Sequence, residues 1–232
     1  MLDTISALGS SVSPWQILAL VVAYLLALCL AMSMHEFSHA FVATKMGDPT
    51  PRLQGRLTLN PFAHISGLGL LTFLIFRFGW AKPVEVNPLR FKNYRKGMTL
   101  VSISGVITNL ILAFIFSGLT FFFVLFLDAT NVFFFFLQYF ALFGFTINTV
   151  LAVFNFLPIA PLDGYNLIKS LSKPGNAFVR FMEKYGFIIL LVFLISPIFD
   201  LFYSYVIIGL ENIFMDFGDY LYNGRKHSRN YV

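Results

Sequence analysis

The chain has 232 residues, of which 58% are hydrophobic and only 12% are charged, and its mean hydropathy is +0.78. A soluble domain is about 45–50% apolar and about 25% charged, so this chain has too little polar surface to cover a water-soluble globule. Its hydrophobicity also excludes intrinsic disorder. The net charge of +5 predicts no nucleic-acid partner, because the basic residues gather in segments between apolar runs. The composition predicts one lipid-embedded domain.

Long stretches without charge delimit the predicted spans, because a transmembrane helix needs about 20 predominantly apolar residues. The N-terminal segment has no basic residue, so it does not resemble a cleavable signal peptide. The first helix is predicted from Trp15 to about Lys45. Ser13 is its expected N-cap, Pro14 its first residue and Gly47 its end.

Three further uncharged stretches follow later in the chain. Gly97–Leu127 and Ala129–Leu162 are separated only by Asp128, so they predict a helical hairpin that turns near this residue. Tyr185–Leu210 is interrupted only by Asp200, which we expect to mark the outer end of that helix. The chain is therefore predicted to cross the membrane about four times.

Two shorter segments complete the predicted fold. Gly67–Phe76 is too short to cross a bilayer and predicts a re-entrant or interfacial segment. Ala81–Pro88 has proline punctuation and some alternation, which indicates a short strand or loop. The predicted fold class is an all-α integral membrane protein. Residues 1–232 form its single domain, with a core at about 15–172, a C-terminal span at about 178–210 and a tail at 211–232.

The basic residues predict the orientation. Nine of the 16 lie between Lys45 and Lys96 and four more between Lys169 and Lys184, whereas the turn at Asp128 has none. The positive-inside rule makes both basic segments cytoplasmic and both termini external. Topological anchoring is the favoured interpretation of these residues, over recognition of lipid or nucleic acid. We expect a multi-pass protein of the cell membrane, in contact with the lipid bilayer.

The most informative residues are His35-Glu-Phe-Ser-His39, near the cytoplasmic end of the first predicted helix. Residues four apart share one face of a helix, so His35 and His39 can reach one metal ion, with Glu36 beside them. Two imidazoles, a carboxylate and an open position form the usual catalytic zinc shell. The alternative is a polar helix end that meets water. Ionisable groups at membrane depth are costly, which favours a functional site.

This motif alone does not identify the third metal ligand. The candidates are the remaining acids and histidines at membrane depth or at its edge: His64, Asp128, Asp163 and Asp200. Asp128 belongs to the predicted outer turn. Asp163 is better placed, because it follows the third stretch on its return to the cytoplasmic side. Pro158 and Pro161 precede it and would unwind the helix, as the wall of a polar cavity permits.

Two motifs together resemble the site-2 protease family of intramembrane zinc metalloproteases. His35–His39 is followed by the segment Asn155–Gly164, which reads NFLPIAPLDG. Gly55–Ile65 and Phe78–Val84 are similar to segments of the compact bacterial branch without a PDZ domain, and the loops here are too short to hold one. The resemblance extends over roughly Met34–Asn166.

The resemblance implies a role for each motif residue. His35, His39 and Asp163 would bind one Zn²⁺ ion per chain, and Glu36 would be the catalytic acid and base. Asn155 would lie near the substrate backbone, as a second catalytic residue. The family also implies a core of three spans around the metal.

These implications predict a zinc metalloendopeptidase of the kind used in regulated intramembrane proteolysis. Its substrates would be transmembrane or membrane-tethered proteins, hydrolysed by zinc-activated water with Glu36 as general base and then acid. The alternatives are a membrane zinc transporter and a catalytically inactive scaffold of the same fold. A transporter predicts more metal-binding residues along a path through the bilayer than the four histidines and few acids present here.

Several residues have more than one interpretation from the sequence. His64 could be a fourth ligand, an inhibitory residue of a lid or, as favoured, a polar hydrogen-bonding group. Asn109 and Gly105 either line the cavity or form a close helix contact with a satisfied amide. The phenylalanine runs 121–123 and 133–136 are predicted to face lipid.

Overall fold

The computed structural model describes residues 13–64, 66, 82–206 and 209, and within them it contains helices and irregular segments but no strand. The predicted all-α membrane fold is confirmed. In chain order the helices are α2 (Pro14–Met46), α3 (Thr50–Leu53), α4 (Pro61–His64), the 3₁₀ helix η2 (Pro88–Arg90), α6 (Tyr94–Phe126), α7 (Val132–Asn155), α8 (Asp163–Leu171) and α9 (Ala177–Ile195). The predicted re-entrant segment and the C-terminal tail lie outside the described residues.

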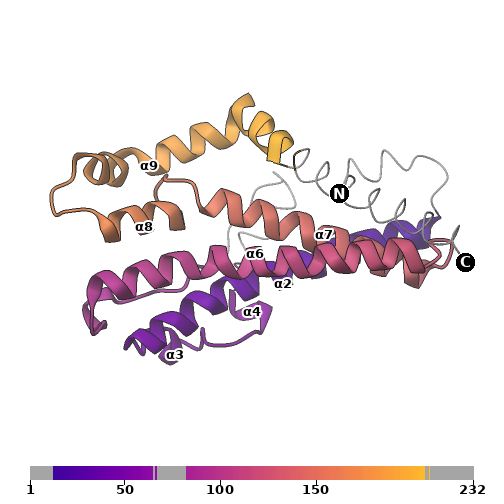
Figure 1. The fold of residues 1–232 in the computed structure, drawn as a ribbon, viewed down its shortest axis with the longest axis horizontal. Coiled ribbons are helices and arrows are strands. Elements are labelled where there is room, and N and C mark those ends of the chain that lie inside the picture. The colour runs from indigo at the N-terminus through magenta and orange to yellow at the C-terminus, as the bar shows by residue number, and fades with distance from the viewer. Residues whose placement is uncertain (1–12, 65, 67–81, 207–208, 210–232) are drawn as a thin grey trace, which may run out of the picture.

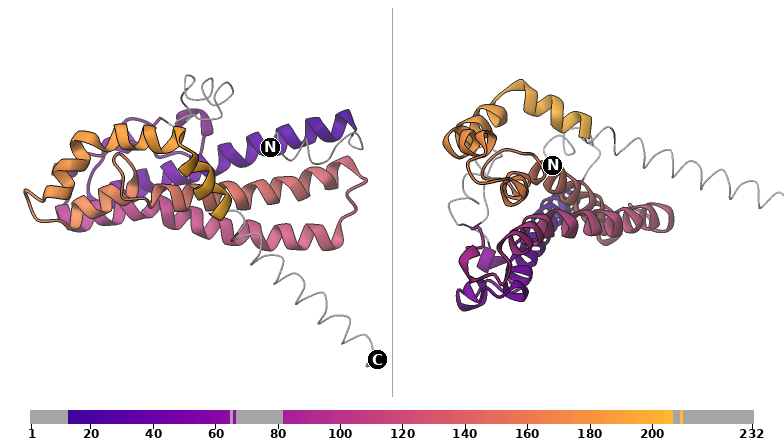
Figure 2. Two further views of the ribbon diagram at one scale, coloured as in Figure 1. Left: turned by 90° about the horizontal axis from the view of Figure 1, so that it is seen from above. Right: turned by 60° about the vertical axis from the view of Figure 1, so that its left-hand side comes forward.

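Three long helices form the body of the molecule. α2, α6 and α7 lie side by side along most of their length, and each packs against the other two (Figures 1 and 2). Each of the three is long and apolar enough to cross a membrane. The expected three-span core is therefore present as a bundle, and α8 and α9 lie against one end of it (Figure 1).

The ends of α2 follow the local sequence. The Ser13 side chain accepts a hydrogen bond from Gln16 N–H, and the Gln16 side chain accepts one from Ser13 N–H, which completes a capping box. The helix ends at Gly47, whose φ of 110° lies in the left-handed region that glycine adopts without strain. Both predicted ends of this helix are confirmed.

One face of α2 carries small or ligand-type residues at every fourth position, and all of them are buried. These residues are Ala19, Ala23, Ala27, Ala31, His35, His39 and Ala43. Small side chains let helix backbones approach closely, which is the usual basis of helix association in lipid. α7 packs on the alanine part of this face with Phe135 and Phe143. The two histidines therefore continue a packing surface instead of facing lipid.

The α6–α7 hairpin turns at residues 127–131, as expected. The Asp128 carboxylate accepts a hydrogen bond from Thr130 N–H, which lowers the pKa of Asp128, and Asn131 caps the first turn of α7. The prediction that 133–136 faces lipid is wrong at Phe135, which is 5% exposed against α2, whereas Phe133 is 61% exposed. A continuous phenylalanine run hides the helical period that separates these faces.

The predicted fourth span is broken. α9 begins at Ala177, close to the predicted start at about 178, but it ends at Ile195, and the helical segment Pro197–Val206 follows it at an angle of 75°. Pro197 lacks an N–H group and its ring excludes the preceding turn, so Ser196 adopts an extended conformation. Asp200 lies exposed within the second segment and does not mark the end of a straight helix. The described residues contain three helices long and apolar enough to cross a membrane, or four candidate spans if the bent pair counts as one.

Residues 82–87, the described part of the predicted strand or loop, form a loop without regular secondary structure. Two backbone N–H groups of this loop bind acidic side chains of α2 and the turn after it. Val84 N–H donates to Glu36 Oε2 at 3.0 Å, and Asn87 N–H donates to Asp48 Oδ2 at 2.6 Å. Asp48 is fully buried and also accepts from Thr50. The loop is thereby fastened along the C-terminal part of α2.

A close contact between α6 and α7 generates the first prediction. A Cβ atom on Gly144 would lie 2.5 Å from the ring of Phe116, which is itself held edge-to-face by Phe140. We expect Gly144→Ala to destabilise the bundle by ~1–3 kcal/mol through overpacking. Thermal unfolding of the purified protein in detergent measures the effect. Gly118→Ala on the same bundle is the control, because nothing lies within 4 Å of its added Cβ. Equal melting temperatures for the two variants would contradict the prediction.

Candidate metal centre

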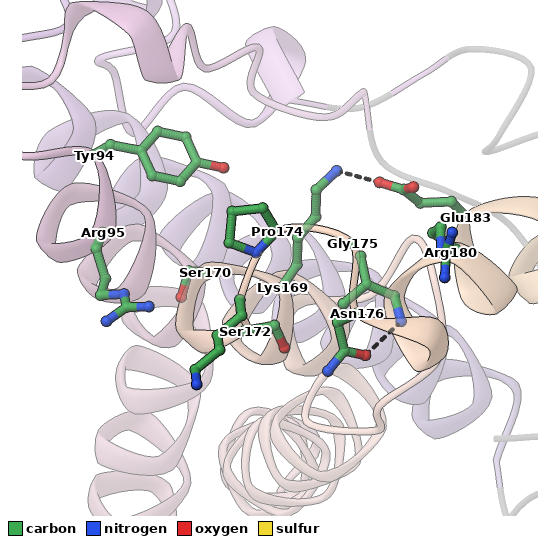
Figure 3. A pocket seen from close by; sticks show the side chains of 12 residues that line it. Tyr94, Arg95, Lys169, Ser170, Ser172, Pro174, Gly175, Asn176, Arg180 and Glu183 are labelled. Carbon is green, nitrogen blue, oxygen red and sulfur yellow. Dashed lines mark hydrogen bonds and ion pairs between the residues drawn. The ribbon is translucent and has the colours of Figure 1, made fainter.

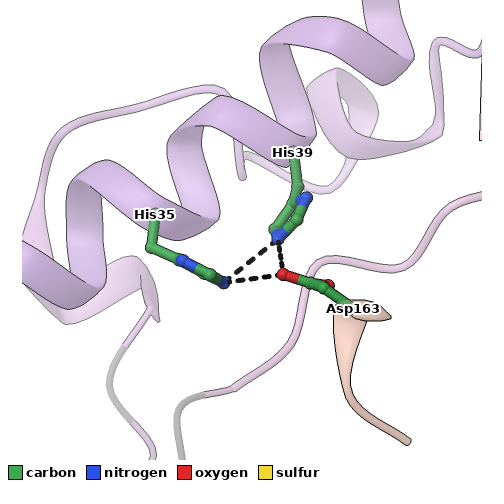
Figure 4. A group of neighbouring side chains, drawn as sticks. All are labelled: His35, His39 and Asp163. Carbon is green, nitrogen blue, oxygen red and sulfur yellow. Dashed lines mark hydrogen bonds and ion pairs between the residues drawn. The ribbon is translucent and has the colours of Figure 1, made fainter. Parts of the chain in front are cut away.

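Three predicted ligand residues meet in the structure (Figure 4). Nε2 of His35 lies 3.3 Å and Nε2 of His39 lies 3.2 Å from Oδ2 of Asp163, and the two Nε2 atoms are 3.1 Å apart. The histidines come from adjacent turns of α2, and Asp163 is the first residue of α8. The three side chains are only about 9–15% exposed. The residues 156–162, which link α7 to α8 and include Pro158 and Pro161, bring Asp163 back to the bundle.

A chain of side-chain amides sets the orientation of His35. Gly144 C=O can only accept a hydrogen bond, and Asn148 Nδ2–H donates to it at 2.7 Å. Asn148 Oδ1 then accepts from Asn109 Nδ2–H at 2.7 Å, and Asn109 Oδ1 accepts from His35 Nδ1–H at 2.5 Å. Both asparagines are fully buried. Each step fixes the next, so the neutral His35 imidazole carries its proton on Nδ1 and directs the lone pair of Nε2 toward Asp163.

His39 is oriented by a shorter route to the same result. Its Nδ1–H donates to Val101 C=O at 2.8 Å, and a backbone carbonyl can only accept. Ser104 Oγ lies 3.2 Å from the same nitrogen. In its neutral form the His39 imidazole therefore also presents a lone pair on Nε2.

The donor set fits a bound cation. When both imidazoles are neutral, two Nε2 lone pairs and a carboxylate oxygen converge, and Oδ2 of Asp163 is buried with no neighbour in hydrogen-bond reach other than the two imidazoles. Such an arrangement is costly unless a positive charge lies among the three atoms. All three ligand atoms lie within 4.8 Å of one another, so one metal ion could contact all of them.

Gly105 of α6 makes this arrangement possible. A Cβ atom at this position would lie 2.6 Å from Nε2 of His39 and closer still to Cε1 of His35. Of the two interpretations of Gly105 and Asn109, the close helix contact with a satisfied amide is the one observed. The Asn109 amide forms one of its hydrogen bonds with the candidate ligand His35 itself. The spacing of the two residues along the chain did not indicate this contact.

The other singled-out residues lie outside this group. Asn155 is the last residue of α7, and its Nδ2–H donates to Leu151 C=O at 3.0 Å. His64 is fully buried and its Nε2–H donates to Thr58 C=O at 2.8 Å, in keeping with the favoured hydrogen-bonding interpretation. Asp128 and Asp200 are exposed and are not in the metal group.

Sequence reasoning missed Asn148 and Asp48. Asn148 stands in an otherwise apolar helix, and a buried amide in such a helix signals an internal hydrogen bond. Asp48 directly follows the glycine at the end of α2, where a solvated loop residue is the default expectation. Its full burial depends on a loop that returns about 40 residues later, which no local pattern indicates.

Comparisons with known proteins agree with this geometry. The chain is 42% identical over 194 residues to a Bacillus subtilis protein named "Putative zinc metalloprotease YwhC", an alignment that covers 81% of this chain and 83% of that protein. It is 31% identical over 202 residues to "Putative zinc metalloprotease Rip2" of Mycobacterium tuberculosis H37Rv, over 82% of this chain and 73% of the relative. The chain belongs to the site-2 protease family of zinc metalloproteases.

A second Rip2 protein, "Putative zinc metalloprotease Rip2" of Mycolicibacterium smegmatis, is 32% identical to the chain over 183 residues. The alignment covers 76% of this chain and 66% of that protein. No family model matches the chain. No solved structure matches it with significance. The resemblance inferred from the two motifs is thus confirmed by similarity to named relatives over about four fifths of this chain, and zinc is the metal that the relatives' names give.

The contact at Gly105 generates a second prediction. Gly105→Ala should push the two imidazoles apart and lower Zn²⁺ affinity about tenfold or more, because metal sites tolerate only small changes in ligand distance. Competition with a chromogenic chelator measures the affinity on metal-free protein. Gly118→Ala, with open space around its Cβ, should bind Zn²⁺ like the unmodified protein. Undiminished binding by Gly105→Ala would argue against ligation by this histidine pair.

The amide chain generates a third prediction. Asn148→Leu frees the Asn109 amide to rotate and to present its N–H to His35, which favours the wrong tautomer. We expect a loss of Zn²⁺ affinity of roughly 10–100-fold, the usual effect of losing a group that orients a ligand. Thr149→Val is the control, because the Thr149 hydroxyl donates only to Phe145 C=O within α7. If both variants lose affinity equally, general loosening of α7 explains the result and the orienting role is wrong.

Proposed function

We propose that this site-2 protease family member is an intramembrane zinc endopeptidase of the cell membrane, which cleaves transmembrane or membrane-tethered proteins. The observation that carries the proposal is the convergence of three candidate ligand atoms, from His35, His39 and Asp163, inside a bundle of helices long and apolar enough to cross a membrane. A transporter would need further ligands along the bundle. Among the described residues, no second group of three His, Cys, Asp or Glu side chains lies close enough to hold a metal.

In this proposal His35, His39 and Asp163 hold the Zn²⁺ ion. When bound, zinc supplies Lewis-acid chemistry, because it acidifies water and polarises a carbonyl oxygen. The protein contributes the geometry. The amide chain and Val101 C=O keep the imidazoles in the metal-binding tautomer, and the low exposure of the ligands limits competing solvent.

Glu36 is the proposed general base. It neighbours His35 on α2, and the N–H of Val84 holds its Oε2 atom. The carboxylate takes a proton from the attacking water and later gives it to the leaving amine nitrogen, so the peptide C–N bond breaks without a free amide anion. The hydrogen bond from Val84 fixes the direction of the carboxylate during both transfers.

The substrate must reach this site as an extended chain. Carbonyl groups of a helix are already hydrogen-bonded and shielded, so a transmembrane substrate has to unwind before cleavage. The loop 82–87 passes beside Glu36 and offers such a segment a neighbouring backbone. Val84 N–H is already used by Glu36, so pairing would rely on other groups of the loop. Asn155, at the end of α7, is the proposed side-chain contact with the substrate backbone.

The fourth prediction tests catalysis separately from metal binding. Glu36→Gln keeps an oxygen for the Val84 N–H but cannot accept a proton, so cleavage should fall by on the order of 10²–10⁴-fold while one Zn²⁺ per chain is retained. The measurements are elemental analysis and cleavage of a purified single-span protein with glycine and proline in its transmembrane segment. Glu85→Gln is the control, since this exposed residue contacts only Gln54 in the described structure. Full activity of Glu36→Gln would overturn the assigned base, and well-folded unmodified protein without zinc would overturn the site.

A further inference from the structure

A basic pocket lies away from the metal centre, where α6, α8 and α9 begin or end (Figure 3). Its volume is about 380 Å³, large enough for a small polar group. Four basic side chains from three helices and one loop line it: Arg95, Lys169, Lys173 and Arg180. The sequence assigned these residues to topological anchoring, and nothing along the chain indicated that they share one cavity.

The charge of the pocket is largely uncompensated. Lys169 Nζ pairs with Glu183 Oε1 at 2.7 Å, and this hydrogen bond raises the pKa of Lys169, so the side chain stays protonated. Arg95 contributes one long hydrogen bond, of 3.4 Å, to Leu171 C=O. Within the described parts of the chain, neither Lys173 nor Arg180 makes an ion pair. A pocket with such an excess of cationic donors suits a phosphate group.

The pocket lies where the helices leave the hydrocarbon. The basic residues of α6 all fall in its first turn, and the 27 positions from Leu100 to Phe126 carry no charge. Charged residues of α9 likewise end at Lys184, before an apolar run to Ile195. Basic side chains at this depth lie at the level of lipid head groups.

Exposed apolar side chains adjoin the pocket residues in the sequence and favour a lipid over a free anion. Leu171, Phe178 and Phe181 are 55%, 38% and 50% exposed, and each is the direct neighbour of a pocket residue. Exposed apolar groups beside a water-filled phosphate site would be unfavourable, whereas beside a lipid head group they contact its acyl chains.

We propose that this pocket binds the phosphate group of an anionic membrane phospholipid. The ligand would connect α6, α8 and α9 at the cytoplasmic surface. α8 is only nine residues long and carries Asp163 at its first position and Lys169 near its last. The bound lipid therefore holds the far end of the helix that supplies the carboxylate of the metal centre. The inference does not depend on catalysis.

The test is lipid retention by the full-length protein, measured by native mass spectrometry in a neutral detergent. Dioleoyl phosphatidylglycerol and dioleoyl phosphatidylcholine are compared at equal concentration, and phosphatidylglycerol should be retained preferentially. The double variant Lys173→Gln/Arg180→Gln should lose about tenfold or more of this affinity, since each basic residue near a lipid surface contributes about 1 kcal/mol. Lys173→Arg/Arg180→Lys should retain it.

Arg52→Gln/Lys92→Gln is the matched control, because both residues are basic and exposed and lie outside the pocket. If this control variant retains phosphatidylglycerol like the unmodified protein, the result supports the pocket. If it loses as much affinity as the pocket variant, net charge explains the effect and the proposal is overturned. Displacement of phosphatidylglycerol by excess inorganic phosphate at constant ionic strength would point to a free anion and also overturn it. Unchanged melting temperatures show that each variant is folded.

Discussion

The metal centre depends on one constraint, which is that polar side chains inside an apolar bundle must find their partners within the protein. Two backbone carbonyl groups, those of Val101 and Gly144, accept hydrogen bonds and cannot donate them. They define the direction of every hydrogen bond that leads from them to the histidines. The lone pairs at the centre are therefore a consequence of backbone groups on two neighbouring helices. A metal ion would complete the set, because among the described residues only the two imidazoles lie within hydrogen-bond reach of Asp163 Oδ2.

Close helix approach is the second requirement, and small residues supply it. The alanine face of α2 lets α7 pack near enough for aromatic side chains to fill the remaining space. On α6, Gly105 brings the backbone against both imidazoles, at a distance that no side chain would permit. The same small-residue packing that stabilises the bundle thus brings the hydrogen-bond partners of His35 and His39 within reach.

Features fixed by neighbouring residues could be predicted from the sequence. The capping box at Ser13, the end of α2 at Gly47 and the histidine pair all depend on contacts within one or two helical turns. The prediction of Asp163 as a ligand needed a further signal, because its approach to the histidines depends on the end of the helix before it. The helix-breaking residues Pro158 and Pro161 supplied that signal. In each case the signal and its physical cause lie in the same short segment.

Features that depend on distant contacts could not be predicted in the same way. The role of Asn148 depends on Asn109, 39 residues away, and the burial of Asp48 depends on Asn87. Pro197 is a local signal for the break, but the span was predicted from the spacing of charged residues. That spacing indicated Asp200 and not Pro197 as the end of the helix. Within the run 133–136, composition alone carried no information about which phenylalanine faces α2.

The ligands and the proposed base are held by different parts of the molecule. Helices fix His35 and His39, because their partners lie on α6 and, through Asn148, on α7. Glu36 instead takes its only described hydrogen bond from the loop 82–87, which Asp48 fastens at its other end. A shift of this loop would therefore reorient the base without disturbing metal binding. Since the loop also borders the proposed path of the substrate, arrival of an extended segment could align Glu36 while the helices keep the metal in place.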